Sequence, residues 1–235
     1  MRRCVRLFGD FRHEQDDPDR FYGALARDSV GQLGQYVDLD GVLMLDIGGG
    51  PGYFREAFEQ AGATYIALDA DVGEMSGAGD KSARRVVGDG MRLPFRDDAF
   101  HLSYSSNVLE HVPYPWCLAE EMLRVTRPGG IAFVSYTVWF GPWGGHETAP
   151  WHYLGGAWAR RRYQRKHGHE AKNKFGDSLF AVTVADGLRW ARTQDAGTVV
   201  DVLPRYHPRG ARWLLRVPAL REVAAWNLVL VLRKT

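Results

Sequence analysis

The first 138 residues alternate between short apolar runs and amphipathic segments. The run Val42–Leu45 contains no polar position and is soon followed by glycines, a pattern typical of a strand buried on both faces of a parallel sheet. Segments of helical character separate further runs of this kind, which indicates βαβ units with right-handed crossovers. We expect strands at residues 42–45, 65–68, 85–87, 99–104 and 131–138, and helices at 53–60, through 109, and at 117–125. A sharp turn at residues 127–130 should lead into the fifth strand.

This regular alternation stops after Trp139. Two later stretches, residues 139–182 and 204–222, are irregular and rich in basic and aromatic residues. Near the start of the chain, Asp17 and Pro18 mark the beginning of a helix, with Asp as N-cap and Pro in the first turn. The remaining expected elements are a helical segment within 10–37, a helix at 184–192, and strands at 198–203 and 226–232.

These elements predict a single α/β domain over residues 1–235, built on a doubly wound, mostly parallel sheet of seven strands. Lid insertions follow the fifth strand and separate the sixth from the seventh. We divide the chain into an N-terminal helical segment (1–40), a core (41–138), a substrate-cap insertion (139–182) and a C-terminal part (183–235) that carries the insertion 204–222.

Composition and charge are those of an ordinary globular protein, with 45% hydrophobic and 25% charged residues. The net charge of +2 is too small to indicate nucleic acid, and the basic residues concentrate between Arg160 and Lys174. Cys4 and Cys117 match no metal-binding spacing, and no run of eighteen apolar residues occurs. We therefore expect a cytoplasmic protein without nucleic-acid partner or stable membrane insertion, and leave monomer and homodimer open.

A glycine-rich loop follows the first expected strand, in the sequence Asp46-Ile47-Gly48-Gly49-Gly50-Pro51-Gly52. Glycines allow a tight turn and a close approach of the backbone to a ligand, and the next helix points its N-terminus at that ligand. Dinucleotide-binding loops need Gly-x-Gly-x-x-Gly, which would require a third glycine at Tyr53. The spacing is instead acid-x-Gly-x-Gly-x-Gly.

Further segments follow this loop in a recognisable order: Asp69 at the end of the second strand, Gly88-Asp89-Gly90-Met91, Leu93-Pro94-Phe95, Leu109-Glu110-His111 and Arg127-Pro128-Gly129-Gly130. The set, within residues 43–136, resembles class I S-adenosylmethionine-dependent methyltransferases of the small-molecule, methyltransferase domain 11-like group, actinobacterial type. The resemblance implies a Rossmann-like fold, S-adenosylmethionine as methyl donor and S-adenosylhomocysteine as product.

The resemblance also implies which residues hold the cofactor. Asp46 faces its ammonium end, Asp69 accepts hydrogen bonds from the ribose with Asp71 as the alternative, and Asp89 binds the adenine amino group. The cofactor-binding set is Asp46, Gly48, Gly50, Gly52, Asp69, Ala70, Asp89, Gly90, Met91, Ser106 and Asn107.

Two histidines are candidates for the catalytic base. His111 follows the fourth strand, where ligands bind in doubly wound sheets, although it equally fits a role in capping or packing its helix. His146 is the second candidate. A metal site is conceivable from Glu110, His111, His146, Glu147 and His152. However, Asn107 replaces an acid that ubiquinone-pathway O-methyltransferases have, so we expect no metal.

The insertions are the expected acceptor-binding region, with Tyr136, Trp139, Glu147, His152 and Tyr153 as substrate-binding residues. Basic residues from Arg160 to Lys166 either bind an anion or form a solvated helix face. The insertion 204–222 completes the cap, forms a subunit interface or touches a membrane surface through Trp213.

The expected activity is methyl transfer to a small-molecule acceptor, at a hydroxyl of a sugar-containing or other secondary metabolite. Methylation of nitrogen or of a lipid-linked acceptor, and cofactor binding by a non-catalytic partner subunit, remain alternatives. RNA methylation and dehydrogenation are disfavoured, because no RNA-binding module is visible and the loop spacing fails the dinucleotide pattern.

Overall fold

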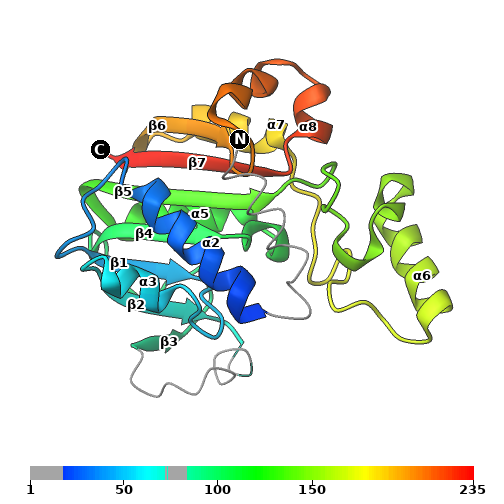
Figure 1. The fold of residues 1–235 in the computed structure, drawn as a ribbon, viewed down its shortest axis with the longest axis horizontal. Coiled ribbons are helices and arrows are strands. Elements are labelled where there is room, and N and C mark those ends of the chain that lie inside the picture. Colours follow the sequence, from blue (N-terminus) through cyan, green and yellow to red (C-terminus); the bar gives the residue numbers. More distant parts are fainter. Residues whose placement is uncertain (1–17, 72, 74–83) are drawn as a thin grey trace.

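The computed structural model describes residues 18–71, 73 and 84–235. A seven-stranded sheet runs through it in the order β3-β2-β1-β4-β5-β7-β6 (Figure 1). The strands are β1 (Leu43–Ile47), β2 (Thr64–Asp69), β3 (Arg85–Val87), β4 (Phe100–Ser106), β5 (Thr126–Thr137), β6 (Gly197–Pro204) and β7 (Asn227–Lys234). Pairs among β1 to β5 are parallel, and β7 is antiparallel to both its neighbours. The expected doubly wound, mostly parallel sheet is confirmed.

Helices cover both faces of the sheet. On one face lie α2 (Pro18–Leu33) and α3 (Arg55–Gln60), and on the other α5 (Pro115–Val125) and α7 (Val184–Thr193). Successive strand residues point to opposite faces, so Phe133 packs in the α2 and α3 core while Val134 packs in the α5 and α7 core. The polar edge formed by the strand ends is thereby held between two apolar layers.

Some elements differ from the expectation. The segment Arg127-Pro128-Gly129-Gly130, expected as a turn, lies inside β5, where the register with β4 shifts and Gly129 has φ +77°. A glycine with left-handed backbone conformation is typical of a β-bulge. The helix expected through residue 109 is only one 3-10 turn, η1 (Leu109–His111), and the helix expected from Tyr53 begins at Arg55. The part of the N-terminal segment before Pro18 lies outside the described residues.

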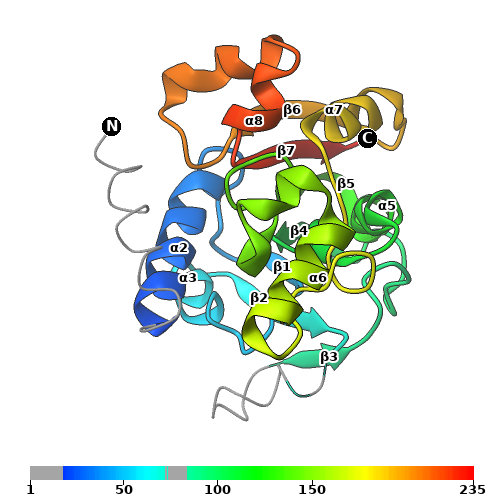
Figure 2. The ribbon, with the colours of Figure 1, turned by 90° about the vertical axis from the view of Figure 1, so that its right-hand side faces the viewer.

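The cap insertion stands beyond the carboxyl ends of the parallel strands. It contains η2 (His146–Thr148), η3 (Trp151–Leu154) and the helix α6 (Gly156–His167), which agrees with a helix face as one of the two interpretations of the basic run. Figure 1 shows α6 on the side to which the arrowhead of β5 points, and Figure 2 shows it in front of the sheet. Hydrogen bonds from Trp139 N to Val182 O (2.9 Å) and from Phe180 N to Glu110 O (2.8 Å) fasten its base.

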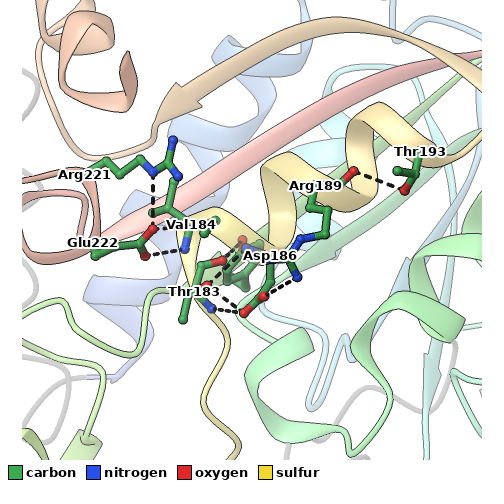
Figure 3. Close-up of polar contacts among 9 residues, drawn as sticks. Thr183, Val184, Asp186, Arg189, Thr193, Arg221 and Glu222 are labelled. Carbon is green, nitrogen blue, oxygen red and sulfur yellow. Dashed lines mark hydrogen bonds and ion pairs between the residues drawn. The ribbon is translucent and has the colours of Figure 1, made fainter. Parts of the chain in front are cut away.

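The second insertion, with η4 (Arg209–Arg216) and α8 (Leu220–Ala224), is tied to the start of α7 (Figure 3). Thr183 and Asp186 form a capping box there. The carboxylate of Glu222 also accepts from Val184 N (2.8 Å) and Ala185 N (2.9 Å). Because the first amides of a helix lack partners and carry partial positive charge, this carboxylate joins the insertion to the core.

Among the described residues, no helix combines the length and apolar character needed to cross a membrane. Cys117 is a free, exposed thiol, and Cys4 lies outside the described part of the chain.

Candidate active site

The glycine loop lies at the edge where β1 ends, between β2 and β4. Gly48, Gly50 and Gly52 all have positive φ, of +76°, +48° and +91°. At Gly48 a Cβ would also lie 2.3 Å from a methyl carbon of Val108. Glycine is therefore required here both by the left-handed backbone and by close contact with the turn that follows β4. The loop and η1 pack directly against each other.

Asp46 is buried at 2% exposure, and its carboxylate accepts a hydrogen bond from the hydroxyl of Tyr65. Burial raises the pKa of Asp46 from 3.8 to about 7, against the lowering effect of the Tyr65 hydrogen bond and with a smaller raising effect from the charge of Asp69. A buried carboxyl whose only hydrogen-bond donor among the described residues is a tyrosine is incompletely compensated. Such a group favours a cationic ligand.

The other two acids lie at neighbouring strand ends. Asp69 accepts from Gly50 N (3.0 Å) and Asp71 N (3.0 Å), so it links the second strand to the glycine loop. Asp89 is exposed and accepts from Met91 N (2.8 Å). A Cβ at Gly90 would lie 3.2 Å from Ile47, which places this loop against the end of β1. Ala70 follows Asp69 and is exposed. The structure thus brings the expected cofactor residues of β1, β2 and β3 to one edge.

Ser106 and Asn107 reach the same edge, but their side chains turn toward the second insertion. Ser106 Oγ accepts from Arg205 (2.6 Å), and Asn107 Oδ1 accepts from the Asn227 amide (2.6 Å). Asn107 also has φ +58°, a left-handed conformation that asparagine tolerates better than most residues. The oxygen atoms of both side chains are thus engaged away from the glycine loop, while their backbone groups lie at the same edge.

Arg205 is a residue that sequence reasoning missed. Its side chain is fully buried and donates to four hydroxyl groups: Ser106 (2.6 Å), Ser135 (2.8 Å), Ser29 (2.7 Å) and Tyr104 (3.1 Å). These hydroxyls come from α2, β4 and β5, so one guanidinium ties three elements together below the site. Nothing in the local sequence Pro204-Arg205-Tyr206 distinguishes it from an exposed loop arginine.

Two histidines and a glutamate converge beside the glycine loop. One potential ligand atom from each of Glu110, His111 and His146 lies within 4.8 Å of the others, and the two imidazole rings are 5.0 Å apart at 66°. His111 Nδ1 lies 2.8 Å from the Ser178 carbonyl. This carbonyl can only accept, so Nδ1 carries the proton and Nε2 keeps its lone pair. Both expected catalytic histidines therefore lie in one cluster.

His146 is uncharged at neutral pH. Burial lowers its pKa from 6.5 to about 4; the charge of Glu110 opposes this effect, and His111 and His152 add to it. His146 also has φ +46°, an uncommon conformation for a residue with a side chain. The turn thus holds a neutral imidazole against the glutamate.

The residues expected to bind the acceptor divide into two groups. Tyr153 and Glu147 are exposed on the cap, where Glu147 accepts from the Asn173 amide (3.0 Å). Trp139 and His152 are buried at its base, with ring centroids 5.2 Å apart. Tyr136 is different.

Tyr136 lies on the α5 and α7 face of the sheet, fully buried, and its hydroxyl donates to Thr183 O (2.8 Å). Its ring packs edge-on against Trp116. This placement is that of a core residue and differs from the expectation that it contacts the acceptor. The reason is strand periodicity, because residue 136 shares a face with Val134 rather than with Ser135.

An aromatic and basic surface covers the outside of the cap. Trp151 and Trp158 are 40% and 41% exposed with ring centroids 6.1 Å apart, and the guanidinium of Arg162 lies 3.9 Å from the Trp151 ring. Arg160 pairs with Glu170 (2.7 Å). The basic run is thus partly neutralised and partly stacked.

Comparisons with known proteins agree with this geometry. A family model described as a methyltransferase domain matches residues 45–134. A curated protein of Mycobacteroides abscessus, named an uncharacterized methyltransferase, is 53% identical over 99% of this chain and 94% of its own length. One of Mycobacterium tuberculosis with the same description is 54% identical over 99% of this chain and 94% of its own length.

Solved structures share the fold at lower identity. An S-adenosylmethionine-dependent methyltransferase of Mesorhizobium loti is 21% identical and aligns with a TM-score of 0.60 over 88% of this chain and 98% of its own. The [4+2]-cyclase SpnF is 20% identical, with a TM-score of 0.56 over 88% of this chain and 81% of its own. With the matched family and the near-full-length relatives, the chain belongs to the S-adenosylmethionine-dependent class I methyltransferases.

Proposed function

We propose that this methyltransferase acts on a hydroxyl group of a small molecule, a sugar-containing or other secondary metabolite. The acceptor oxygen attacks the methyl carbon, the bond between that carbon and the sulfonium sulfur breaks, and S-adenosylhomocysteine leaves. The hydroxyl proton must pass to a base. The observation that supports this proposal is the packing of Val108 on Gly48, which puts the histidine turn immediately beside the glycine loop.

The cofactor lies, in this proposal, along the edge formed by the ends of β1, β2 and β3. Asp46 faces its cationic methionine end and Asp69 takes the ribose hydroxyls. Asp89, with Gly90 and Met91, flanks the adenine, while Gly48, Gly50 and Gly52 allow close approach of the backbone. The raised pKa of Asp46 supports this orientation, because a positive ligand relieves the cost of a buried carboxylate.

His111 is the proposed base and His146 the group that orients the acceptor. His111 presents Nε2 with its lone pair because Nδ1 is engaged by the Ser178 carbonyl. His146, with a pKa lowered from 6.5 to about 4, gains a proton less readily than an ordinary imidazole and is suited to a neutral hydrogen bond. In this proposal His111 accepts the proton of the acceptor hydroxyl, and His146 orients that hydroxyl by a hydrogen bond.

A transfer assay separates this proposal from its rivals. S-adenosylhomocysteine release is measured with panels of glycosides and phenols, of amines, and of lipid-linked sugars. Release with a glycoside or phenol supports O-methylation, and release only with amines or lipid-linked sugars moves the assignment to that acceptor. Tight cofactor binding with no release across every panel contradicts the proposal and favours a non-catalytic partner subunit.

The position of Asp69 gives a first prediction. Asp69→Ala should weaken S-adenosylmethionine binding at least about tenfold, because an ionised acceptor for the ribose hydroxyls is lost. Isothermal titration calorimetry measures this effect. Asp71→Ala is the matched control, since the Asp71 carboxylate accepts from Gly73 N within its own loop (2.7 Å). A loss in the Asp71 variant alone would transfer the ribose contact to that residue.

The exposed tryptophans of the cap give a second prediction. Replacing Trp151 and Trp158 together by alanine should raise the KM for the acceptor about tenfold, because aromatic faces that cover a flat ring or a sugar are lost. The cofactor dissociation constant should not change. Trp213→Ala removes an exposed tryptophan (54%) from the other insertion and is the control. An unchanged acceptor KM in the double variant would show that the cap tryptophans do not take part in acceptor binding.

A further inference from the structure

The cluster of Glu110, His111 and His146 contains polar atoms that its surroundings do not satisfy. Glu110 is only 1% exposed, and its Oε2 has no hydrogen-bond partner among the described residues. His146 Nε2 is also buried without a described partner. A carboxylate oxygen or an imidazole nitrogen that is buried without a hydrogen bond carries a desolvation cost. Two such atoms in one cluster therefore need an explanation.

Each of the three side chains is held by a contact that leaves one donor atom free. Thr137 N donates to Glu110 Oε1 (2.9 Å), which leaves Oε2. The Ser178 carbonyl accepts from His111 Nδ1 (2.8 Å), which leaves Nε2. An imidazole fixed through one nitrogen by a backbone carbonyl is the arrangement found around metal-binding histidines. The Asn173 side-chain amide lies 3.5 Å from His146 Nδ1, which leaves Nε2.

The three groups come from two distant parts of the chain. Glu110 and His111 belong to η1, and His146 begins η2 in the cap insertion. The Asn107 side chain is not part of the set, because it is bound to Asn227. The site thus forms only where the cap meets the strand ends.

We propose that Glu110, His111 and His146 bind one divalent transition-metal ion, of the class of Zn²⁺ or Co²⁺. Two imidazoles with one carboxylate favour these ions over Mg²⁺, which prefers oxygen ligands and water. Donor atoms around a tetrahedral Zn²⁺ lie about 3.4 Å apart, so small side-chain rotations close the present separation of up to 4.8 Å. Three protein ligands leave a further position open for water or an acceptor oxygen.

This proposal departs from the expectation of no metal and does not depend on the proposed methyl transfer. In the loaded state both imidazoles are ligands, so the ion and the proton of an acceptor compete for the same lone pairs. Binding is measured without acceptor or S-adenosylmethionine. A failure of the transfer assay therefore leaves the metal result intact, and the reverse also holds.

The test uses the untagged full-length chain after chelator treatment and dialysis. Co²⁺ is added and its visible d–d absorption is followed, and Zn²⁺ binding is measured by calorimetry. We expect one ion per chain, with the intense Co²⁺ spectrum of four-coordinate geometry. Glu110→Gln and His146→Gln should each weaken binding at least about a hundredfold, because each removes a ligand. Glu110→Gln keeps the oxygen that accepts from Thr137.

Two controls separate this site from adventitious binding. Glu147→Gln changes an exposed carboxylate next to His146 and should leave the affinity unchanged. Replacement of His167 and His169, an exposed pair with ring centroids 6.1 Å apart, should also leave it unchanged. The proposal is overturned if no saturable binding occurs, or if binding persists in both the Glu110 and His146 variants while their circular dichroism matches that of the wild type.

Discussion

Replacing Asp46 by asparagine is expected to stabilise the cofactor-free protein at pH 8 and to weaken S-adenosylmethionine binding about a hundredfold. Asparagine keeps an oxygen that accepts from the Tyr65 hydroxyl, so the local contact survives. It removes the buried negative charge. That charge destabilises the cofactor-free protein, and it attracts the cationic methionine end of the bound cofactor. The same residue thus acts in opposite directions on stability and on affinity.

The pH dependence of the free energy of unfolding follows from the direction in which folding shifts the pKa of Asp46. The folded-state pKa of Asp46, about 7, lies above its ordinary value of 3.8, so the folded chain binds this proton more tightly than the unfolded chain. Its contribution to the free energy of unfolding is complete below pH 3.8 and is lost as the pH rises through 7. The difference of about three pH units corresponds to about 4 kcal/mol.

Thermal unfolding of the two proteins without cofactor, between pH 4 and pH 8, measures this effect. The asparagine variant should unfold several degrees higher at pH 8, and the advantage should shrink as the pH approaches 4. Calorimetry gives the cofactor affinity of each. Equal unfolding temperatures of the wild type and the asparagine variant at pH 8 would contradict a destabilising buried charge at Asp46. An unchanged affinity for S-adenosylmethionine would show that Asp46 does not contact the cofactor.

His111→Ala is expected to reduce kcat between about a hundredfold and ten-thousandfold, the range for loss of a general base. The cofactor dissociation constant should stay within about twofold of the wild type, because His111 lies on the turn beside the glycine loop rather than in it. Single-turnover methyl transfer with an acceptor identified by the panel measures the chemical step.

A second variant separates catalysis from packing. His111→Asn offers a side-chain amide that can donate to the Ser178 carbonyl, as Nδ1 does now, but no basic nitrogen. If His111 is the base, this variant should match the wild type in unfolding temperature and remain as slow as the alanine variant. Recovery of kcat in the asparagine variant would show instead that the histidine only positions its turn.

The fold was largely predictable because its signals are local. Buried apolar runs such as Val42–Leu45 mark strands without reference to the rest of the chain. The cap helix α6 was offered only as one interpretation of the basic run and without bounds, since its sequence Gly156–His167 is strongly basic and lacks a clear apolar stripe. The bulge at Gly129 was taken for a turn because a Pro-Gly-Gly sequence favours both.

The candidate site was predictable only where one short segment carries it. The glycine loop and the acid that precedes it occupy seven consecutive residues, and Asp69 ends the next strand. Arg205 instead joins hydroxyls as far away in sequence as Ser29, a separation of 176 residues. Likewise, His146 lies near Glu110 only because the cap insertion folds back over the strand ends. No sequence spacing predicts that contact.

The placement of β7 also constrains how this protein can be made. β7 follows the six other strands that the structure describes, yet it lies between β5 and β6 and pairs with both. Until residues 227–234 have left the ribosome, β5 presents an open edge and β6 has no neighbour in the sheet. Synthesis of the earlier strands therefore yields a nascent chain with a vacant place inside the sheet, between β5 and β6, where β5 is exposed to wrong pairing with other chains.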